Sequence, residues 1–386
     1  MKLDIREELK FQLGLKKLRL VNFSTLQEDY RQQLISVRDF INSGFQSYQR
    51  DTKVCLLFDF IDSNQLNGLA FSSNSTEQNF RFATVHAGAI LYFHIFFPYL
   101  MSRMDILPSV GSPALEKNLP ITFRPGRSHP AMSPLEGYEI ASIVPTCPER
   151  LEFANQMARA ATLFLAFHEV GHCVNGHVMC SNFQLDEIDE ISTQSSEETL
   201  RRHTLEMDAD AYAVNHLLKL NLHNMGLGTK NDGLSEEQEL HLAGLLHPVF
   251  IGINLLFRLF TRIEKIPIDQ ADFLKGTHPN AAVRSHLSRV TVSSIAFAWG
   301  LQNKDRPWLT NLATRSAIDA LRIWEAITGT QEPARLLLTF MQDGKTERTG
   351  LNMVWEYTNS LLECWRTIRP ELLPFALNDL VKPTDD

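Results

Sequence analysis

The stretch "AFHEVGHCVNGHV" (residues 166–178) places three histidines and a glutamate within ten positions of an otherwise apolar, helix-like run. Polar side chains are costly to bury unless they are paired or bind a ligand. His168 and His172 are four residues apart, so on a helix both imidazoles project from one face and can bind one zinc ion. Glu169 is adjacent and can act on a water at that ion without being a ligand. This HExxH pattern predicts a zinc site with its own general base.

The segment "HTLEMDADAYAV" (203–214) offers the third ligand. Glu206 and Asp210 are four residues apart on one face of a second predicted helix. A carboxylate from Glu206 would complete a two-histidine, one-glutamate site with one position open for water, which is typical of catalytic zinc. We expect Asp210 to accept the N–H of a ligating imidazole, and Asp208 to be exposed. The alternative is a solvated acidic helix face.

His177 is a weaker candidate for the third ligand. In HExxHxxGxxH sites a glycine breaks the helix and a further histidine completes the set, but Gly176 and His177 each miss that register by one residue. On a continuous helix His177 would lie about 180° from His168. We therefore expect His177 to be a residue of the helix end, or one that contacts a ligand from outside.

Composition narrows the class of protein. The 386 residues carry a formal net charge of −8, which argues against nucleic acid as the main partner. The five cysteines are odd in number and lack CxxC spacing, so neither a disulfide framework nor a cysteine zinc site is indicated. The first residues, "MKLDIREELKFQLG", are charged throughout and do not resemble a secretory signal. A reducing cytoplasm is the expected compartment.

Hydrophobic periodicity predicts a mainly helical chain with a few strands. The proline-rich residues 105–150 predict an irregular excursion, and the acidic residues 181–200 predict a loop or lid. The expected strands are 52–62 and 67–73, and the expected helices include residues 1–50, 85–101, 149–175, 200–220, 240–257 and most of the C-terminal part.

Two apolar segments raise the question of a membrane. Residues 85–101 are short for a span, while residues 240–257 are about long enough. Both contain histidine and proline, and Arg258 directly follows the second segment. We interpret both as buried helices and keep a membrane span as the alternative.

The motifs together resemble a known group of enzymes. HEVGHxxxGH at 168–177, Glu206-x-x-Ala-Asp210, and Thr277-His278-Pro279 with Arg284 resemble the gluzincin metallopeptidases of the HtpX/CAAX-prenyl-endopeptidase group. Their order and spacing are also similar to those of soluble Lit-type phage-exclusion peptidases of bacteria. "LNGLAF" (66–71) with an apolar helix after it resembles the strand–helix unit that precedes HExxH in that group.

The resemblance covers roughly residues 50–290 and implies a fold. We expect an α+β, predominantly α protein, in which a zincin-like core (51–290) contains a small sheet and the HExxH helix. A helical segment (1–50) precedes this core and a helical extension (291–386) follows it.

The resemblance also implies a zinc-dependent endopeptidase with one Zn²⁺ ion, acting on a protein or peptide. His168, His172 and Glu206 would hold the metal, Glu169 would be the general base, and Asp210 and Arg284 would support the ligands. His278 would donate to the oxyanion or contact the metal; alternatively, His278 and Pro279 only shape a loop held by Arg284. Substrate would pair with residues 67–71 as an added strand.

Two rival functions remain open. One is a metal-containing binding or regulatory protein that uses the same scaffold without turnover. An intact Glu169 counts against it, because a binding module has no use for a base beside the metal. The other is an integral membrane protease.

Overall fold

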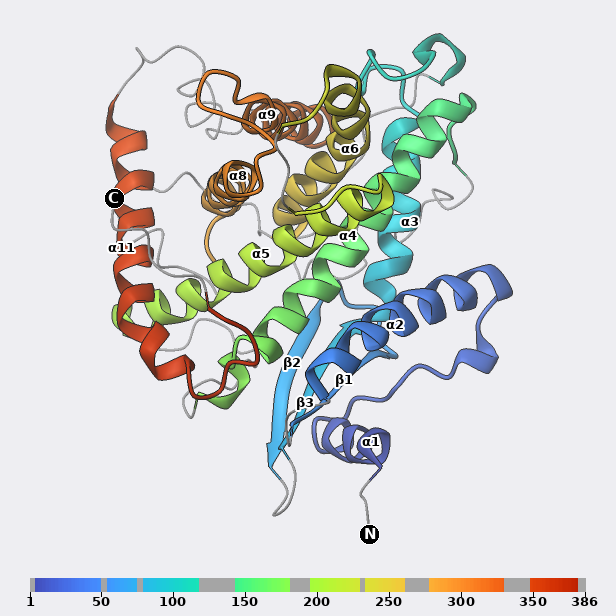
Figure 1. Cartoon of the computed structure of the whole chain (residues 1–386). Helices are drawn as coiled ribbons and strands as arrows, with labels where there is room; N and C mark the ends of the chain where they lie inside the picture. The colour runs from blue at the N-terminus through green and yellow to red at the C-terminus, as the bar shows by residue number, and fades with distance from the viewer. Residues whose placement is uncertain are drawn as a thin grey trace.

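The computed structural model describes residues 4–49, 54–74, 79–117, 143–180, 195–229, 233–260, 278–329 and 348–380. These form long helices around one small sheet, which confirms the predicted α+β, predominantly α class (Figure 1). The strands are β1 (Val54–Ile61), β2 (Gly68–Asn74) and β3 (Asn79–His86). The helices are α1 (Ile5–Leu15), α2 (Glu28–Gln49), α3 (Ala87–Met101), α4 (Pro148–Val174), α5 (Ser196–Asn224), α6 (Glu236–Phe260), α8 (Ala281–Ala298), α9 (Trp308–Thr328) and α11 (Arg348–Leu372), with short 3-10 turns η1 (Phe23–Thr25), η2 (Pro113–Leu115) and η4 (His177–Met179).

The sheet has the order β1-β3-β2, with β3 parallel to β1 and antiparallel to β2. Sequence analysis missed the central strand β3. Its segment "NFRFATVH" alternates polar and apolar residues at its start, but it is buried along nearly its whole length, polar residues included. Arg81 is among its buried side chains and donates to the Cys173 carbonyl at 2.6 Å. This bond ties the sheet to the end of α4.

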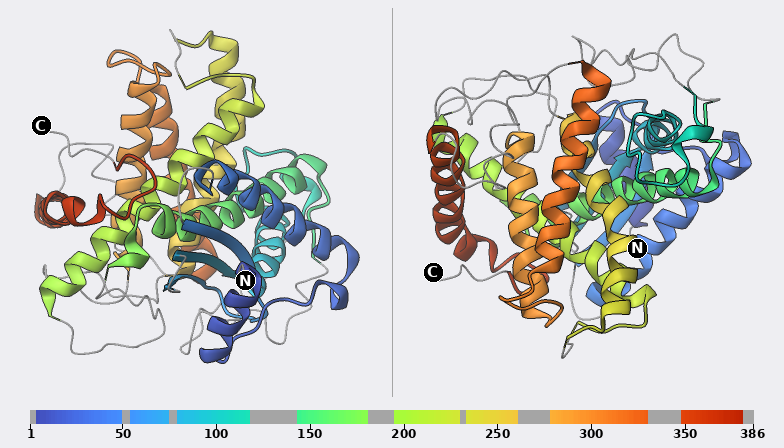
Figure 2. Two further views of the ribbon diagram at one scale, coloured as in Figure 1. Left: turned by 60° about the horizontal axis from the view of Figure 1, so that its bottom comes forward. Right: turned by 90° about the horizontal axis from the view of Figure 1, so that it is seen from above.

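Helix α4 is the centre of the molecule. It packs against α3, α5 and α6 and against strands β2 and β3 (Figures 1 and 2). Gly171 allows α5 to come close, because a Cβ at this position would lie 3.2 Å from the Ala209 Cα. Helices α4 and α5, which carry the predicted metal ligands, are therefore in close contact at Gly171 and Ala209.

Helix α6 is the apolar segment that raised the membrane question. By length and composition alone it could cross a membrane, but 67% of its most apolar window is buried inside the fold. It packs against α4, α8 and α9. The core helix of a soluble protein passes the same test, so this helix is weak evidence for a span.

The C-terminal helices pack onto the rest of the molecule. Helix α9 contacts α6 and α8, while α11 contacts α5 and α8. Beyond α11 the chain returns to the end of the HExxH helix, where the Leu377 N–H donates to the Val174 carbonyl at 2.8 Å. The division at residues 50 and 290 stays a prediction.

Two loop predictions fall partly outside the described residues. These are the proline-rich excursion, for residues 118–142, and the acidic loop or lid, for residues 181–194. The predicted loop at 181–200 is wrong at its end, since α5 begins at Ser196. The Ser195 side chain caps this helix by accepting from the Glu198 N–H, and two glutamates occupy its first turn.

Candidate metal centre

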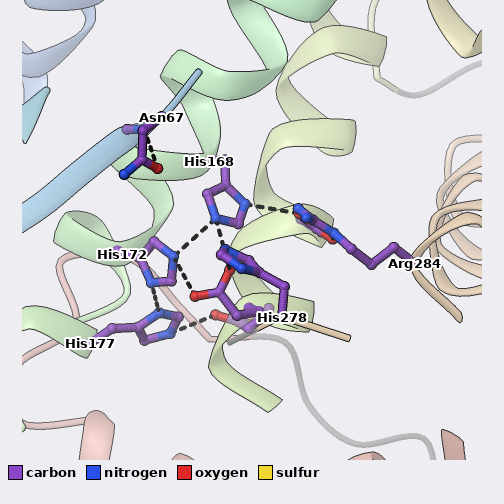
Figure 3. Close-up of polar contacts among 10 residues, drawn as sticks. Asn67, His168, His172, His177, His278 and Arg284 are labelled. Atoms are coloured by element: carbon purple, nitrogen blue, oxygen red, sulfur yellow. Dashed lines mark hydrogen bonds and ion pairs between the residues drawn. The ribbon is translucent and has the colours of Figure 1, made fainter. Parts of the chain in front are cut away.

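His168 and His172 from α4 meet Glu206 from α5 in the interior of the protein (Figure 3). The Nε2 atoms of the two histidines are 3.1 Å apart. Glu206 Oε2 lies 3.1 Å from His168 Nε2, and Oε1 lies 3.5 Å from His172 Nε2. One ligand atom from each residue lies within 4.8 Å of the others, so the cluster can hold a metal ion.

The hydrogen bonds around His168 define which nitrogen faces the cluster. Its Nδ1 lies 2.8 Å from Asp210 Oδ1. Because an ionised carboxylate only accepts, Nδ1 carries the proton and donates it. In the neutral ring Nε2 then presents a lone pair toward Glu206. Both carboxylate oxygens of Glu206 are buried, and the imidazole nitrogens of His168, His172 and His278 are the polar groups that face them. A buried carboxylate that faces imidazoles needs a positive charge beside it, either a proton on an imidazole or a cation, and two imidazoles with one carboxylate suit a transition metal ion.

The electrostatics give the same picture. Burial opposes a charge on His168, yet the neighbouring carboxylates of Asp210 and Glu206 raise its pKa to about 10. Burial lowers the pKa of His172 well below its ordinary value. Burial would raise the pKa of Glu206, but the electrostatic effect of His278 and His172 and hydrogen bonds with His168 and His278 hold it well below its usual range. The centre therefore has a carboxylate that demands positive charge, supplied by a proton or by a metal ion.

Arg284 on α8 pairs with Asp210 behind His168. Its Nε donates to Oδ2 at 2.8 Å and its Nη2 donates to Oδ1 at 2.7 Å. The guanidinium also lies over the Phe257 ring, 4.4 Å from its centroid. Asp210 is buried, which would raise its pKa, but Arg284 holds this pKa below the ordinary value. An Arg–Asp–His chain thus fixes the orientation of His168.

Glu169 lies beside strand β2. Gly68 is so close that a Cβ built on it would be 2.3 Å from Glu169 Oε1. Asn67 precedes this glycine near His168 and His172, and its side chain accepts from the Gly68 N–H (Figure 3). Within the described residues β2 pairs only with β3, so it is an edge strand next to the candidate base.

His278 is the most exposed member of the group. Its Nε2 lies 3.1 Å from Glu206 Oε2, and its side chain is 21% exposed whereas that of Glu206 is fully buried. It comes from the residues just before α8, and its predicted neighbour Thr277 lies outside the described residues. His278 therefore stands between the cluster and solvent.

Asp208 was misjudged from the sequence, whereas His177 lies outside the metal cluster and contacts a ligand, as expected. Asp208 was expected to be exposed, but it is only 5% exposed. The reason is the turn after α4, which covers it: Asn175 Nδ2 and His177 Nε2 lie 2.5 and 3.1 Å from Asp208 Oδ2. His177 is outside the metal cluster, and its Nδ1 lies 2.9 Å from His172 Nδ1. The signal in the sequence was Gly176, whose φ of +86° ends the helix and turns His177 back.

Residues 141–302 match the family model for Peptidase U49. This region includes α4, α5, α6, α8 and every predicted metal and catalytic residue. No curated protein and no solved structure matches the chain. Of the two groups that the motifs resemble, the match supports the Lit-type peptidases and does not point specifically to the HtpX/CAAX-prenyl-endopeptidase group. Over residues 141–302 the chain is therefore similar to a peptidase family, with a His168–His172–Glu206 cluster that can hold a metal ion.

Proposed function

We propose that this protein is a zinc-dependent endopeptidase that hydrolyses peptide bonds in a protein or peptide substrate. The observation that carries the proposal is the buried convergence of His168 Nε2, His172 Nε2 and Glu206 directly beside Glu169, in the region that matches a peptidase family. Two histidines and one carboxylate leave a coordination position for a reactant, as in catalytic zinc sites. When bound, Zn²⁺ supplies a Lewis acid that polarises the scissile carbonyl and makes water acidic enough to react near neutral pH.

Each protein group then has a definite role. Glu169 accepts a proton from the attacking water and delivers it to the leaving amine. Its carboxylate packs against Gly68, and this contact restricts its position beside the cluster. His278 lies on the more exposed side, where its imidazole N–H would donate to the carbonyl oxygen as negative charge develops there. Asp210 and Arg284 orient His168 and do not contact substrate.

We infer that substrate binds as an extended strand along the start of β2. This edge of the sheet has no other strand partner within the described residues and lies next to Glu169. Main-chain pairing with an edge strand aligns a peptide without demanding a particular sequence. Farther along, the Ser72 hydroxyl donates to the Val178 carbonyl at 2.8 Å, so η4 limits how far such a peptide extends.

We propose a cytoplasmic location. The cysteines of the described residues form no disulfide bond with one another, which suits a reducing compartment. The membrane alternative rests on α6, which passes the length and composition test but is mostly buried. Retention of the expressed protein in the detergent-free supernatant would support the cytoplasmic proposal, and a requirement for detergent would support the alternative.

The experiment compares Glu169→Gln with Glu206→Gln and with Glu152→Gln, an exposed position on the same helix. Each variant is analysed for bound zinc and for cleavage of an unbiased peptide library read by mass spectrometry. We expect Glu169→Gln to keep one zinc and lose at least 100-fold in kcat/KM, a loss in the range of general acid–base catalysis. We expect Glu206→Gln to lose the zinc, and the Glu152 variant to match the wild type.

Undiminished cleavage by Glu169→Gln would refute the proposed mechanism. Zinc in the wild type with no cleavage of any library or proteome-derived peptide would instead favour the metal-containing binding or regulatory protein.

A further inference from the structure

The turn that follows the HExxH helix carries a buried polar chain that the proposed chemistry does not use. His177 is fully buried, and Asn175 and Asp208 are 6% and 5% exposed. The chain runs from His172 Nδ1 to His177 Nδ1 at 2.9 Å, and from His177 Nε2 to Asp208 Oδ2 at 3.1 Å (Figure 3). The same carboxylate oxygen accepts from Asn175 Nδ2.

The direction of each hydrogen bond follows from the carboxylate at the far end. Ionised Asp208 only accepts, so His177 Nε2 carries a hydrogen and donates it. In the neutral ring, Nδ1 of His177 is then an acceptor. His172 must therefore donate from its own Nδ1, which leaves its Nε2 with a lone pair. This Nε2 is the atom that faces His168 and Glu206 in the cluster.

A parallel arrangement acts on the other histidine of the motif. Asp210 fixes His168 directly through Nδ1 at 2.8 Å, again leaving Nε2 free. Asp208 and Asp210 both come from α5, two residues apart, and each acts on a different histidine of α4. Asp210 hydrogen-bonds directly to His168, whereas Asp208 is linked to His172 only through His177.

We propose that Asp208 and His177 are positioning residues that hold His172 in the tautomer and orientation needed for metal binding through Nε2. The inference rests on the proposed metal site but not on proteolysis. Carboxylate partners of metal-bound histidines raise ligand basicity and reduce the freedom of the ring. Asn175 holds the Asp208 oxygen in place, and Gly176 supplies the left-handed turn that brings His177 back to His172.

The test measures metal binding and not activity. Affinities for Zn²⁺ are obtained by chelator competition, and the ligand field is read from the visible spectrum of the Co²⁺-loaded protein. His177→Leu and Asp208→Ala break the relay, while His177→Gln and Asp208→Asn retain hydrogen-bonding atoms of similar reach. His223→Leu, at an exposed position on α5, is the matched control. Urea unfolding of each metal-free variant establishes that it is folded.

We expect His177→Leu and Asp208→Ala each to weaken Zn²⁺ binding by 10- to 100-fold, the range usual for such outer partners, and to shift the Co²⁺ spectrum. The two conservative variants should recover most of the affinity, and the control should bind as the wild type does. Because both residues act in series, the double variant His177→Leu/Asp208→Ala should bind Zn²⁺ no more weakly than the single variant with the lower affinity.

Affinities within about twofold of the wild type and an unchanged Co²⁺ spectrum in folded His177→Leu and Asp208→Ala would overturn the relay while leaving the proposed function intact. Additive losses in the double variant would also overturn it, because they would mean separate structural roles. Wild-type protein that binds no metal would overturn both proposals. Relay-dependent binding without any peptide cleavage would support the relay and contradict the proposed function alone.

Discussion

Gly68 has no side chain, and this leaves room for the carboxylate of Glu169, the candidate general base. The carboxylate of Glu169 occupies the space that a Cβ at position 68 would need. Strand interiors usually disfavour glycine, because it packs no side chain and loses more backbone entropy on folding. Its presence at the start of β2 therefore marks a close approach between the strand and the HExxH helix.

We predict that Gly68→Ala displaces the Glu169 carboxylate, since 2.3 Å between Cβ and Oε1 is not tolerated. The expected result is a loss of about 10- to 100-fold in kcat on any accepted peptide, with the zinc content unchanged. Gly44→Ala on α2 is the control, because a Cβ there meets nothing within 4 Å. Equal activities for the two variants would show that the contact does not matter to the base.

Arg284 illustrates the cost of a buried charge. It makes two hydrogen bonds to Asp210, which is itself buried. We predict that Arg284→Met destabilises the folded protein by about 3–5 kcal/mol, because it removes the guanidinium that pairs with a buried carboxylate and leaves only the His168 N–H to donate to it. Urea unfolding of the metal-free protein would measure this change. Arg366→Met removes a partly exposed ion pair with Glu363, and should cost less than about 1 kcal/mol; a similar cost for both would refute the argument.

At the scale of elements, the fit between α4 and α6 depends on one glycine. A Cβ at Gly252 would lie 2.8 Å from the Met157 carbonyl oxygen, which belongs to the backbone of α4. Backbone atoms cannot move aside as a flexible side chain does, so the two helices must separate to admit even a methyl group.

We predict that Gly252→Ala lowers the free energy of unfolding by about 1–3 kcal/mol, the usual cost of overpacking. Gly244→Ala on the same helix is a matched control, because nothing lies within 4 Å of the added methyl. That control should be neutral or stabilising by up to about 1 kcal/mol, since alanine favours a helix over glycine. The prediction fails if thermal or urea unfolding ranks the two variants in the opposite order.

At the scale of the whole molecule, buried neutral histidines link stability to pH. Burial lowers the pKa of His86 from 6.5 to about 4. Between pH 6.5 and about 4, His86 is protonated in the unfolded chain but stays neutral in the folded protein. The contribution of His86 to the free energy of unfolding is therefore complete above pH 6.5, falls as the pH drops toward about 4, and levels off below that.

We predict that His86→Gln flattens this dependence, because a neutral amide takes up no proton. Each fully shifted histidine contributes a slope of up to about 1.4 kcal/mol per pH unit within the window. Urea unfolding of the metal-free wild type and variant at pH 7, 6, 5 and 4.5 would measure the difference. Parallel curves over this range would show that His86 is not a neutral buried group.

The C-terminal part also belongs to this scale. A Cβ on Gly176 would meet Phe375, and the Leu377 N–H caps the Val174 carbonyl. The segment after α11 therefore holds the turn that carries His177. Nothing in the sequence pattern linked residues so far apart, because such a contact has no local periodicity.

The sequence by itself determined the fold class and the core of the candidate site. HExxH on a helix requires His168 and His172 to share a face, and Glu206 and Asp210 follow the same rule on α5, because helical geometry is local. The structure brings these four side chains together as that reasoning expects. The tertiary structure alone decided the roles of β3, Gly68, Asp208 and His177. β3 takes its place at the centre of the sheet by pairing with β1 and β2, which its own letters do not specify. Gly68 depends on the approach of another element, while Asp208 and His177 depend on the turn at Gly176, where the helix stops and helical extrapolation no longer holds.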